Sequence, residues 1–171
     1  MRLTRLTISL IAFGALFLGA SQAQAKSCSA FAVIEAYNAD KSMIKVKWTK
    51  GKARKFFPKP EGAPTDTSKI PGKCKRKVTK ERILPVKSTG GRLSITQVRT
   101  NFEGKMLNDT DDANWLPAKL GELIDAKEKV VLVIRPSVGK DAEMNVTTIY
   151  LPAGPEDLKE IERLEAQAED I

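Results

Sequence analysis

The chain has 171 residues and no histidine, and its 29 lysine and arginine residues outnumber its 21 aspartate and glutamate residues. The lack of histidine excludes Ser-His-Asp and Cys-His nucleophile pairs and the usual histidine-containing zinc and iron sites. No phosphate-binding loop or Gly-x-Gly-x-x-Gly motif is present, and no spacing of carboxylates or lysines indicates an enzyme. The composition therefore favours a non-catalytic protein without a cofactor.

The charge is distributed unevenly along the chain. Residues 26–105 carry 20 basic and 6 acidic side chains, whereas residues 106–171 carry 7 basic and 15 acidic ones. Such asymmetry indicates a front half that meets an anionic partner and an acidic rear half. The plainer interpretation is a strongly charged, solvated surface without a dedicated ligand.

The first 25 residues have the pattern of a secretory signal peptide. Arg2 and Arg5 precede an apolar stretch over residues 6–19, and Ala23-Gln24-Ala25 gives the small-x-small cleavage pattern. No later apolar stretch approaches the roughly 20 residues that a membrane-spanning helix needs. We therefore expect residues 26–171 to be a periplasmic or secreted product without a membrane span.

Two cysteines, Cys28 and Cys74, follow the predicted cleavage site. An even pair in an exported protein predicts a disulfide. One alternative is a pair of free thiols. Another is a lipid anchor on Cys28, but Ala25 and Lys26 fit a lipoprotein cleavage motif poorly.

Residues 26–88 are predicted to form a basic β module. Alternating or apolar runs predict strands at 31–37, 43–48, 53–57, 74–79 and 82–86, with a proline-rich loop from Pro58 to Gly72. Five short strands and one disulfide favour a small, disulfide-stapled antiparallel β-barrel or a curled sheet, because closure removes exposed edges.

Residues 92–171 are predicted to form a second module after Ser88-Thr89-Gly90-Gly91. The expected order is β-β-α-β-β-α, with an acidic C-terminal helix. The first helix is expected over 115–127 because apolar residues recur at helical spacing. The uninterrupted run Val130–Ile134 predicts a central strand that is covered on both faces. The overall fold class is thus a mixture of β and α+β.

Basic side chains cluster in the front module, and period-two alternation would place Lys45 and Lys47 on one strand face and Lys73, Lys75 and Lys77 on another. The aromatic residues Trp48, Phe56 and Phe57 are interleaved, and core packing is favoured over a ligand contact for them, because a small barrel needs aromatic residues inside. The residues expected to form an anion-binding face are Lys45, Lys47, Lys52, Arg54, Lys55, Lys75, Arg76 and Lys77.

The densest group of oxygen ligands is the run from Asn108 to Asn114. It lacks the glycine and the spacing of an EF-hand loop, so capping of the following helix by Asp111, Asp112 and Asn114 is favoured over calcium binding. A hydrolase with paired carboxylates such as Asp109 and Asp111 is a weaker alternative.

These patterns together predict an exported, non-catalytic binding or cell-envelope accessory protein. Its expected partner is a lipid headgroup, an anionic polysaccharide or an acidic protein, and nucleic acid is not expected. The alternative is a secreted inhibitor or a subunit of a protein complex that acts through a salt-resistant interface, with the loop from Pro58 to Gly72 as a candidate surface.

Overall fold

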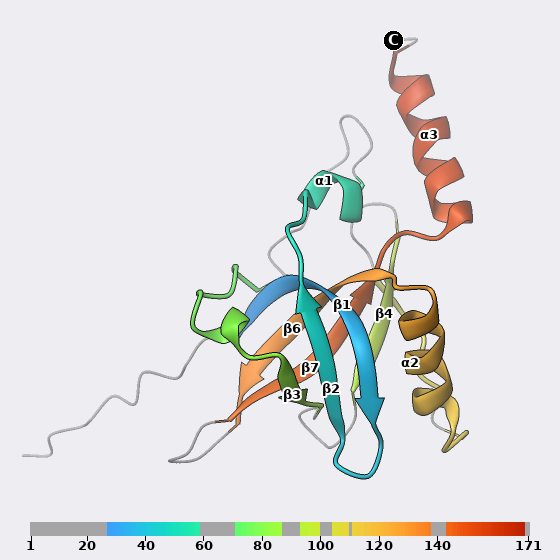
Figure 1. Ribbon diagram of the computed structural model, residues 1–171. Coiled ribbons are helices and arrows are strands. Elements are labelled where there is room, and N and C mark those ends of the chain that lie inside the picture. Colours follow the sequence, from blue (N-terminus) through green and yellow to red (C-terminus); the bar gives the residue numbers. More distant parts are fainter. Residues whose placement is uncertain are drawn as a thin grey trace, which may run out of the picture.

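The computed structural model describes residues 27–58, 71–86, 93–99, 104–109, 111–137 and 143–169. The elements of this part of the chain, in order, are β1 (Cys28–Asn38), β2 (Met43–Trp48), α1 (Ala53–Phe56), the 3-10 turn η2 (Val78–Lys80), β3 (Ile83–Pro85), β4 (Ser94–Val98), β5 (Gly104–Met106), α2 (Trp115–Asp125), β6 (Lys129–Pro136), β7 (Met144–Leu151) and α3 (Pro155–Glu169). Figure 1 shows a sheet-dominated α+β fold.

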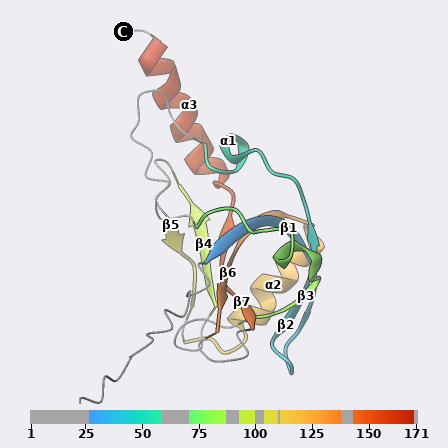
Figure 2. The same cartoon turned by 90° about the vertical axis from the view of Figure 1, so that its left-hand side faces the viewer.

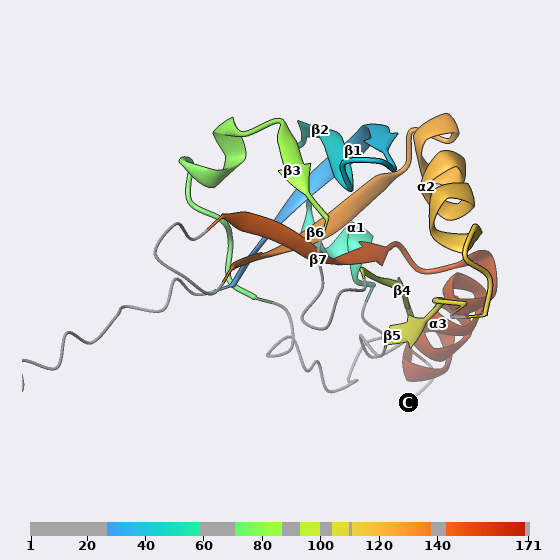
Figure 3. The ribbon, with the colours of Figure 1, turned by 90° about the horizontal axis from the view of Figure 1, so that it is seen from below.

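The described strands form one sheet of seven strands in the order β3-β2-β1-β6-β7-β4-β5. All neighbours are antiparallel except β4 and β7, which run parallel. The sheet is strongly twisted when seen from below (Figure 3). Strands of both predicted modules thus lie in a single sheet, joined where β1 pairs with β6.

The predicted barrel is not supported, because the seven-stranded sheet is not closed and ends in β3 and β5. Val86, directly after β3, forms a single bridge with Val146 of β7, so the sheet curls toward closure as the alternative prediction of a curled sheet expects. Both edge strands have only three residues, and a short edge offers few unpaired backbone groups to another chain. Two segments that were expected to complete the barrel are not strands. Residues 53–57 contain helix α1, and residues 74–79 contain a turn and η2.

Each of these two differences has a physical cause. Phe56 and Phe57 are adjacent and both buried, whereas adjacent side chains of a strand point to opposite faces. A helical turn lets both rings reach the same cluster. The segment at 73–80 offers only Val78 as an apolar residue besides the disulfide-bonded Cys74, so it has no apolar face to place on a sheet.

The two faces of the sheet carry separate apolar clusters. The larger cluster lies on the face that α2 covers, and Figure 2 shows α2 against this face. Leu120 and Leu123 of α2 are buried there, as the helical spacing predicted. The smaller cluster lies on the other face and contains Phe56, Phe57, Val98 and Val131, with Phe31 and Tyr150 packed against it.

Strand β6 is central and buried on both faces, which confirms the prediction from its apolar run. Residues 130–134 are each at most 2% exposed, and β6 lies between β1 and β7. Alternate residues of the strand belong to the two clusters, as Leu132 and Val131 show. An uninterrupted apolar run is therefore what this position requires.

The terminal helix α3 extends beyond the sheet (Figure 1). Arg99, which follows β4, pairs through its Nε with Asp157 Oδ1 of the first helical turn at 3.4 Å. Ile161 is 4% exposed, whereas Leu158 is 42% exposed, so only part of the predicted apolar stripe is covered.

Candidate functional site

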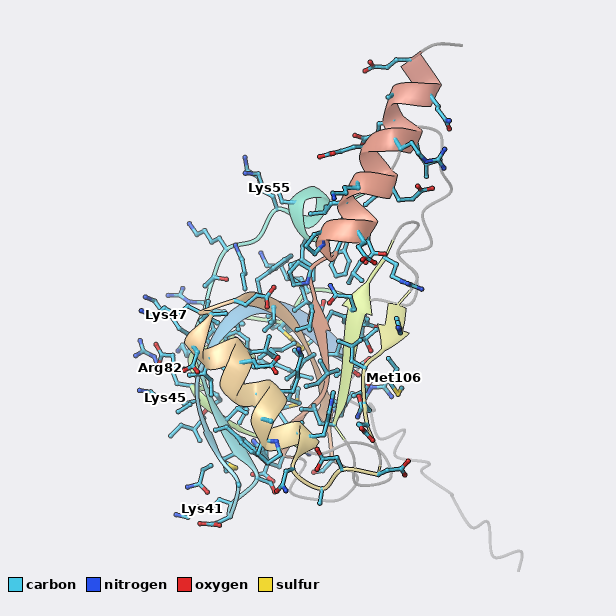
Figure 4. All side chains as sticks on the ribbon, turned by 90° about the vertical axis from the view of Figure 1, so that its right-hand side faces the viewer. Lys41, Lys45, Lys47, Lys55, Arg82 and Met106 are labelled. Carbon is cyan, nitrogen blue, oxygen red and sulfur yellow. A yellow bond between two sulfur atoms is a disulfide. The ribbon has the colours of Figure 1, made fainter. Side chains whose placement is uncertain are left out.

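The two lysines predicted on β2 lie on the sheet face opposite α2. The register pairs Lys47 with Val33 of β1, and Val33 with Lys129 of β6, so the three side chains form one row across three strands. Figure 4 shows Lys45 and Lys47 projecting away from the ribbon on the same side as Arg82. Lys45 Nζ is 3.4 Å from Glu35 Oε2, so its charge is partly balanced.

Beyond the end of β2, the chain is held closely against Phe31. The N–H of Thr49 donates a hydrogen bond to the carbonyl of Phe31 at 2.8 Å. A Cβ atom on Gly51 would lie 2.3 Å from Cγ of Phe31, so only glycine fits without a shift. Lys129 Nζ donates to the carbonyl of Lys50 and lies 5.6 Å from the centroid of the Phe31 ring. Phe31 therefore contacts both the chain after β2 and the side chain of Lys129.

One side of this contact opens into a hollow of about 850 Å³, here called the Trp48 pocket. This volume falls in the range of roughly 300–1,000 Å³ typical of ligand pockets. The residues that line it are Ser29, Ala30, Phe31, Trp48, Thr49, Lys50, Gly51, Lys73, Cys74, Arg76 and Thr79. Three of these are cationic and none is acidic, so the charged side chains of the lining are all positive.

The far wall of the Trp48 pocket is the segment 71–81, which is joined to the sheet at several points. The disulfide between Cys28 and Cys74, predicted from the sequence, is confirmed, so Cys28 is not available as a lipid anchor. The backbone of Ser29 donates to Gly72 and accepts from Cys74, at 2.8 and 2.9 Å. Trp48 Nε1 donates to the carbonyl of Glu81 at 2.6 Å, which fixes the indole ring between strand and wall.

The other side of the Phe31 contact opens into a smaller hollow of about 490 Å³, here called the Phe56 pocket. It is lined by Phe31, Lys50, Gly51, Lys52, Lys55, Phe56, Glu128, Lys129 and Pro152. Its four lysines face one carboxylate, Glu128.

The two pockets share Phe31, Lys50 and Gly51 and form one cationic site. The cations that line it are Lys50, Lys52, Lys55, Lys73, Arg76 and Lys129, against the single acid Glu128. Cations gathered around a concave surface raise the local concentration of anions.

The structure places the eight predicted cations in different surroundings. Lys52 and Lys55 line the Phe56 pocket, and Arg76 lines the Trp48 pocket. Lys45 and Lys47 lie on the adjoining face of β2. Lys75 and Lys77 are exposed, lie outside both linings and do not share a strand face with Lys73, because this segment is not a strand. The side chain of Arg54 lies outside the described residues.

Sequence reasoning missed Lys129 as a site residue. It lies about 75 positions after the basic cluster that it joins, at the start of a strand whose neighbour cannot be read from local periodicity. Lys50 and Lys73 belong to the same sequence clusters as the predicted residues, and clustering alone would have included them.

The three interleaved aromatic residues divide between core and site. Phe56 and Phe57 are each 5% exposed and stack edge to face with centroids 4.7 Å apart, so they are mainly core residues. Trp48 is only partly buried: it packs against the larger apolar cluster and also lines the Trp48 pocket. Next to it, the buried Oγ1 of Thr49 has no hydrogen-bond partner among the described residues.

The acidic run before α2 forms local turns. Asp112 Oδ1 accepts the N–H of Asn114 at 2.8 Å, and Asp109 Oδ1 accepts the N–H of Asp111 at 3.0 Å. Asn114 occupies the N-cap position of α2, but its side chain makes no capping hydrogen bond. Within the described ranges, no group of three or more histidine, cysteine or acidic residues is arranged to hold a metal ion.

The clearest titration effect lies on α3, away from the cationic site. Nε and one terminal nitrogen of Arg163 donate to the Glu160 carboxylate at 2.8 and 2.6 Å. This hydrogen bonding, with the charge of Arg163, holds the pKa of Glu160 below its ordinary value and raises the pKa of Arg163.

In the part of the chain that the structure describes, no helix has the length and apolar character needed to cross a membrane. Comparison of the chain with protein-family models, curated proteins and solved structures gives no significant match. The functional argument therefore depends on the site itself.

Proposed function

We propose that the protein is an exported, non-catalytic binding or cell-envelope accessory protein whose cationic site contacts an anionic partner. One observation carries this proposal: six cations and one carboxylate line two pockets that meet at Phe31 and Lys50. Like charges that line the same hollow repel one another, and an anion between them relieves that repulsion.

The expected compartment supports this choice of partner. The signal-like pattern of residues 1–25 predicts export, and disulfides such as Cys28–Cys74 persist in oxidising compartments. Anionic lipid headgroups, acidic polysaccharides and acidic proteins are the polyanions that an exported protein meets there.

Salt-dependent binding tests the proposal. The purified protein is sedimented with cell-envelope fractions at low and high salt, beside a triple variant with Lys50→Glu, Lys52→Glu and Lys55→Glu. A control variant with a single reversed charge carries Lys41→Glu, because Lys41 lies at the other end of the fold from Lys55 (Figure 4). We expect the wild type and the control to bind at low salt and to release at high salt, and the triple variant to stay in solution.

Two results would contradict the proposal. Equal binding by the triple variant would show that the cationic site is not the contact surface. Stoichiometric binding that survives high salt would favour the alternative function, a secreted inhibitor or a subunit of a protein complex. The loop that we considered for such an interface lies mostly outside the described residues.

A further inference from the structure

The Trp48 pocket offers more than positive charge, and its lining narrows the class of ligand. We infer that it binds an acidic saccharide unit, meaning a sugar ring that carries a carboxylate or a phosphate. This inference rests on the proposed function and specifies the ligand of one part of the same site.

The cations of the pocket account for the acidic substituent. Lys50, Lys73 and Arg76 approach from two directions, the first from the chain after β2 and the others from the segment 71–81. Arg76 offers a planar fork that matches the two oxygens of a carboxylate or a phosphate, and the lysines add point charges. No acidic residue of the lining competes for them.

The indole ring of Trp48 favours a sugar over a simple anion as the ligand. Trp48 is only partly buried and lines the pocket, and the hydrogen bond from its Nε1 to Glu81 holds the indole in place. Phe31 also lines the pocket, but Gly51 and Lys129 already lie against its ring. An aromatic ring held in advance gives contact area at little entropic cost to the apolar C–H face of a pyranose. Inorganic anions have no such face.

Two hydroxyl groups of the pocket can accept hydrogen bonds from a sugar. Ser29 Oγ donates to the carbonyl of Pro71 at 2.6 Å, and Thr79 Oγ1 donates to the carbonyl of Arg76 at 3.3 Å. Because each proton is already committed, the remaining lone pairs of both oxygens are acceptors. Sugar hydroxyls are donors, so they suit these acceptors, whereas a fully ionised polyphosphate has no proton to donate.

A nucleotide also combines a ring, hydroxyls and an anion, but two features favour the saccharide. Proteins that bind single-stranded nucleic acid use successive aromatic platforms along a groove. Here the described lining has two aromatic residues, and Lys129 already lies against the ring of Phe31. The disulfide in the pocket wall also favours an oxidising compartment, and acidic polysaccharides are among the polyanions that an exported protein meets there.

The test uses Trp48 as the reporter. The chain has two tryptophans, so the variant Trp115→Phe leaves Trp48 as the single indole fluorophore. The disulfide-bonded protein is titrated with a short oligogalacturonate and with glucose 6-phosphate, which separate carboxylate from phosphate as the preferred acid. A neutral galactose oligomer, tripolyphosphate and a short oligothymidylate serve as comparison ligands.

We expect a saturable change in Trp48 fluorescence with at least one acidic sugar. The neutral sugar and tripolyphosphate should bind about tenfold more weakly or not at all, because the neutral sugar has no acidic group and tripolyphosphate has no sugar ring. Arg76→Gln and Lys73→Gln should each lower the affinity for the acidic sugar by about tenfold. Lys41→Gln, which lies outside the lining of both pockets, should leave its affinity unchanged. The indole N–H signal of Trp48 in NMR spectra checks both the fold of each variant and the place of binding.

The outcomes separate this inference from the proposed function. If polyanions still sediment with the protein but neither acidic sugar perturbs Trp48, the saccharide inference is wrong and the proposed function stands. If no anion binds in either assay, both fail. If oligothymidylate binds more tightly than either sugar, the pocket is a nucleic-acid site and the saccharide inference is wrong.

Discussion

Gly51 lies so close to Phe31 that a Cβ atom added to it would be 2.3 Å from Cγ of the ring. This contact holds the chain after β2 between the two pockets, because Gly51 and Phe31 line both of them. A residue without charge thus lies at the junction of the two pockets, where a larger side chain would displace Phe31.

The first prediction concerns this contact. Gly51→Ala should lower the free energy of unfolding by about 1–3 kcal/mol, because Phe31 must move and disturb the smaller apolar cluster. Chemical denaturation measures the change. Gly121→Ala is the matched control, since a Cβ there meets nothing within 4 Å and α2 should gain up to about 1 kcal/mol from the better helix former. A Gly51→Ala protein as stable as the wild type would mean that the contact does not constrain the chain.

The second prediction links the disulfide to the Trp48 pocket. Replacing both Cys28 and Cys74 by alanine should lower the stability by roughly 2–4 kcal/mol, because the unfolded chain gains freedom. The same change loosens the wall that carries Lys73 and Arg76, so anion binding should weaken under conditions where the variant is still folded. Calorimetric titration at a temperature well below the unfolding midpoint checks this. Unchanged affinity in the folded variant would show that the hydrogen bonds of Ser29 hold the wall without the disulfide.

The third prediction concerns Thr49. Its buried Oγ1 has no hydrogen-bond partner in the described part of the chain, so Thr49→Val removes an unpaired polar atom and keeps the shape. The variant should be as stable as the wild type or more stable by up to about 1 kcal/mol. Thr96→Val is the comparison, because the Thr96 hydroxyl is 3.2 Å from Oγ of Ser94 and its loss should cost stability. A marked loss of stability in Thr49→Val would reveal a partner for this hydroxyl.

The fourth prediction concerns α3 and pH. Arg163→Gln removes the hydrogen bonds that lower the pKa of Glu160, so that pKa should rise toward its ordinary value. A depressed carboxyl pKa contributes stability above the pKa of the unfolded chain and loses it as the pH falls through the folded value. The difference in stability between wild type and variant should therefore be small, present at neutral pH and absent in acid. An NMR titration of Glu160 checks the shift, with Lys159→Gln as a control that leaves the pair intact. If Glu160 titrates in the same way in Arg163→Gln as in the wild type, a group other than Arg163 lowers its pKa.

Much of the fold could be predicted from local patterns. The alternation in Met43–Trp48 predicted β2 with its observed bounds, and the apolar run Val130–Ile134 predicted a strand buried on both faces. Such patterns are informative because burial on one or two faces leaves a distinct periodicity. The disulfide was predicted because the signal-like pattern indicates export and the number of cysteines is even.

The errors arose where tertiary contacts override local pattern. The segment at 53–57 resembles a strand, but the burial of both Phe56 and Phe57 on one side requires a helical turn. The pairing of β1 with β6, which places front and rear strands in one sheet, joins residues about 100 positions apart. No local periodicity records such a pairing, so Lys129 could not be assigned to the site from sequence.

The most direct test of the central claim is the salt dependence of binding to a soluble polyuronate. The logarithm of the dissociation constant is measured against the logarithm of the salt concentration for the wild type, for Lys50→Gln/Lys52→Gln/Lys55→Gln, and for the Lys41→Gln control. If the cationic site binds the anion, the wild type and the control share a steep slope, and the triple variant binds more weakly with a shallower slope. If all three proteins give the same slope and affinity, the anion binds elsewhere and the assignment of the site is wrong.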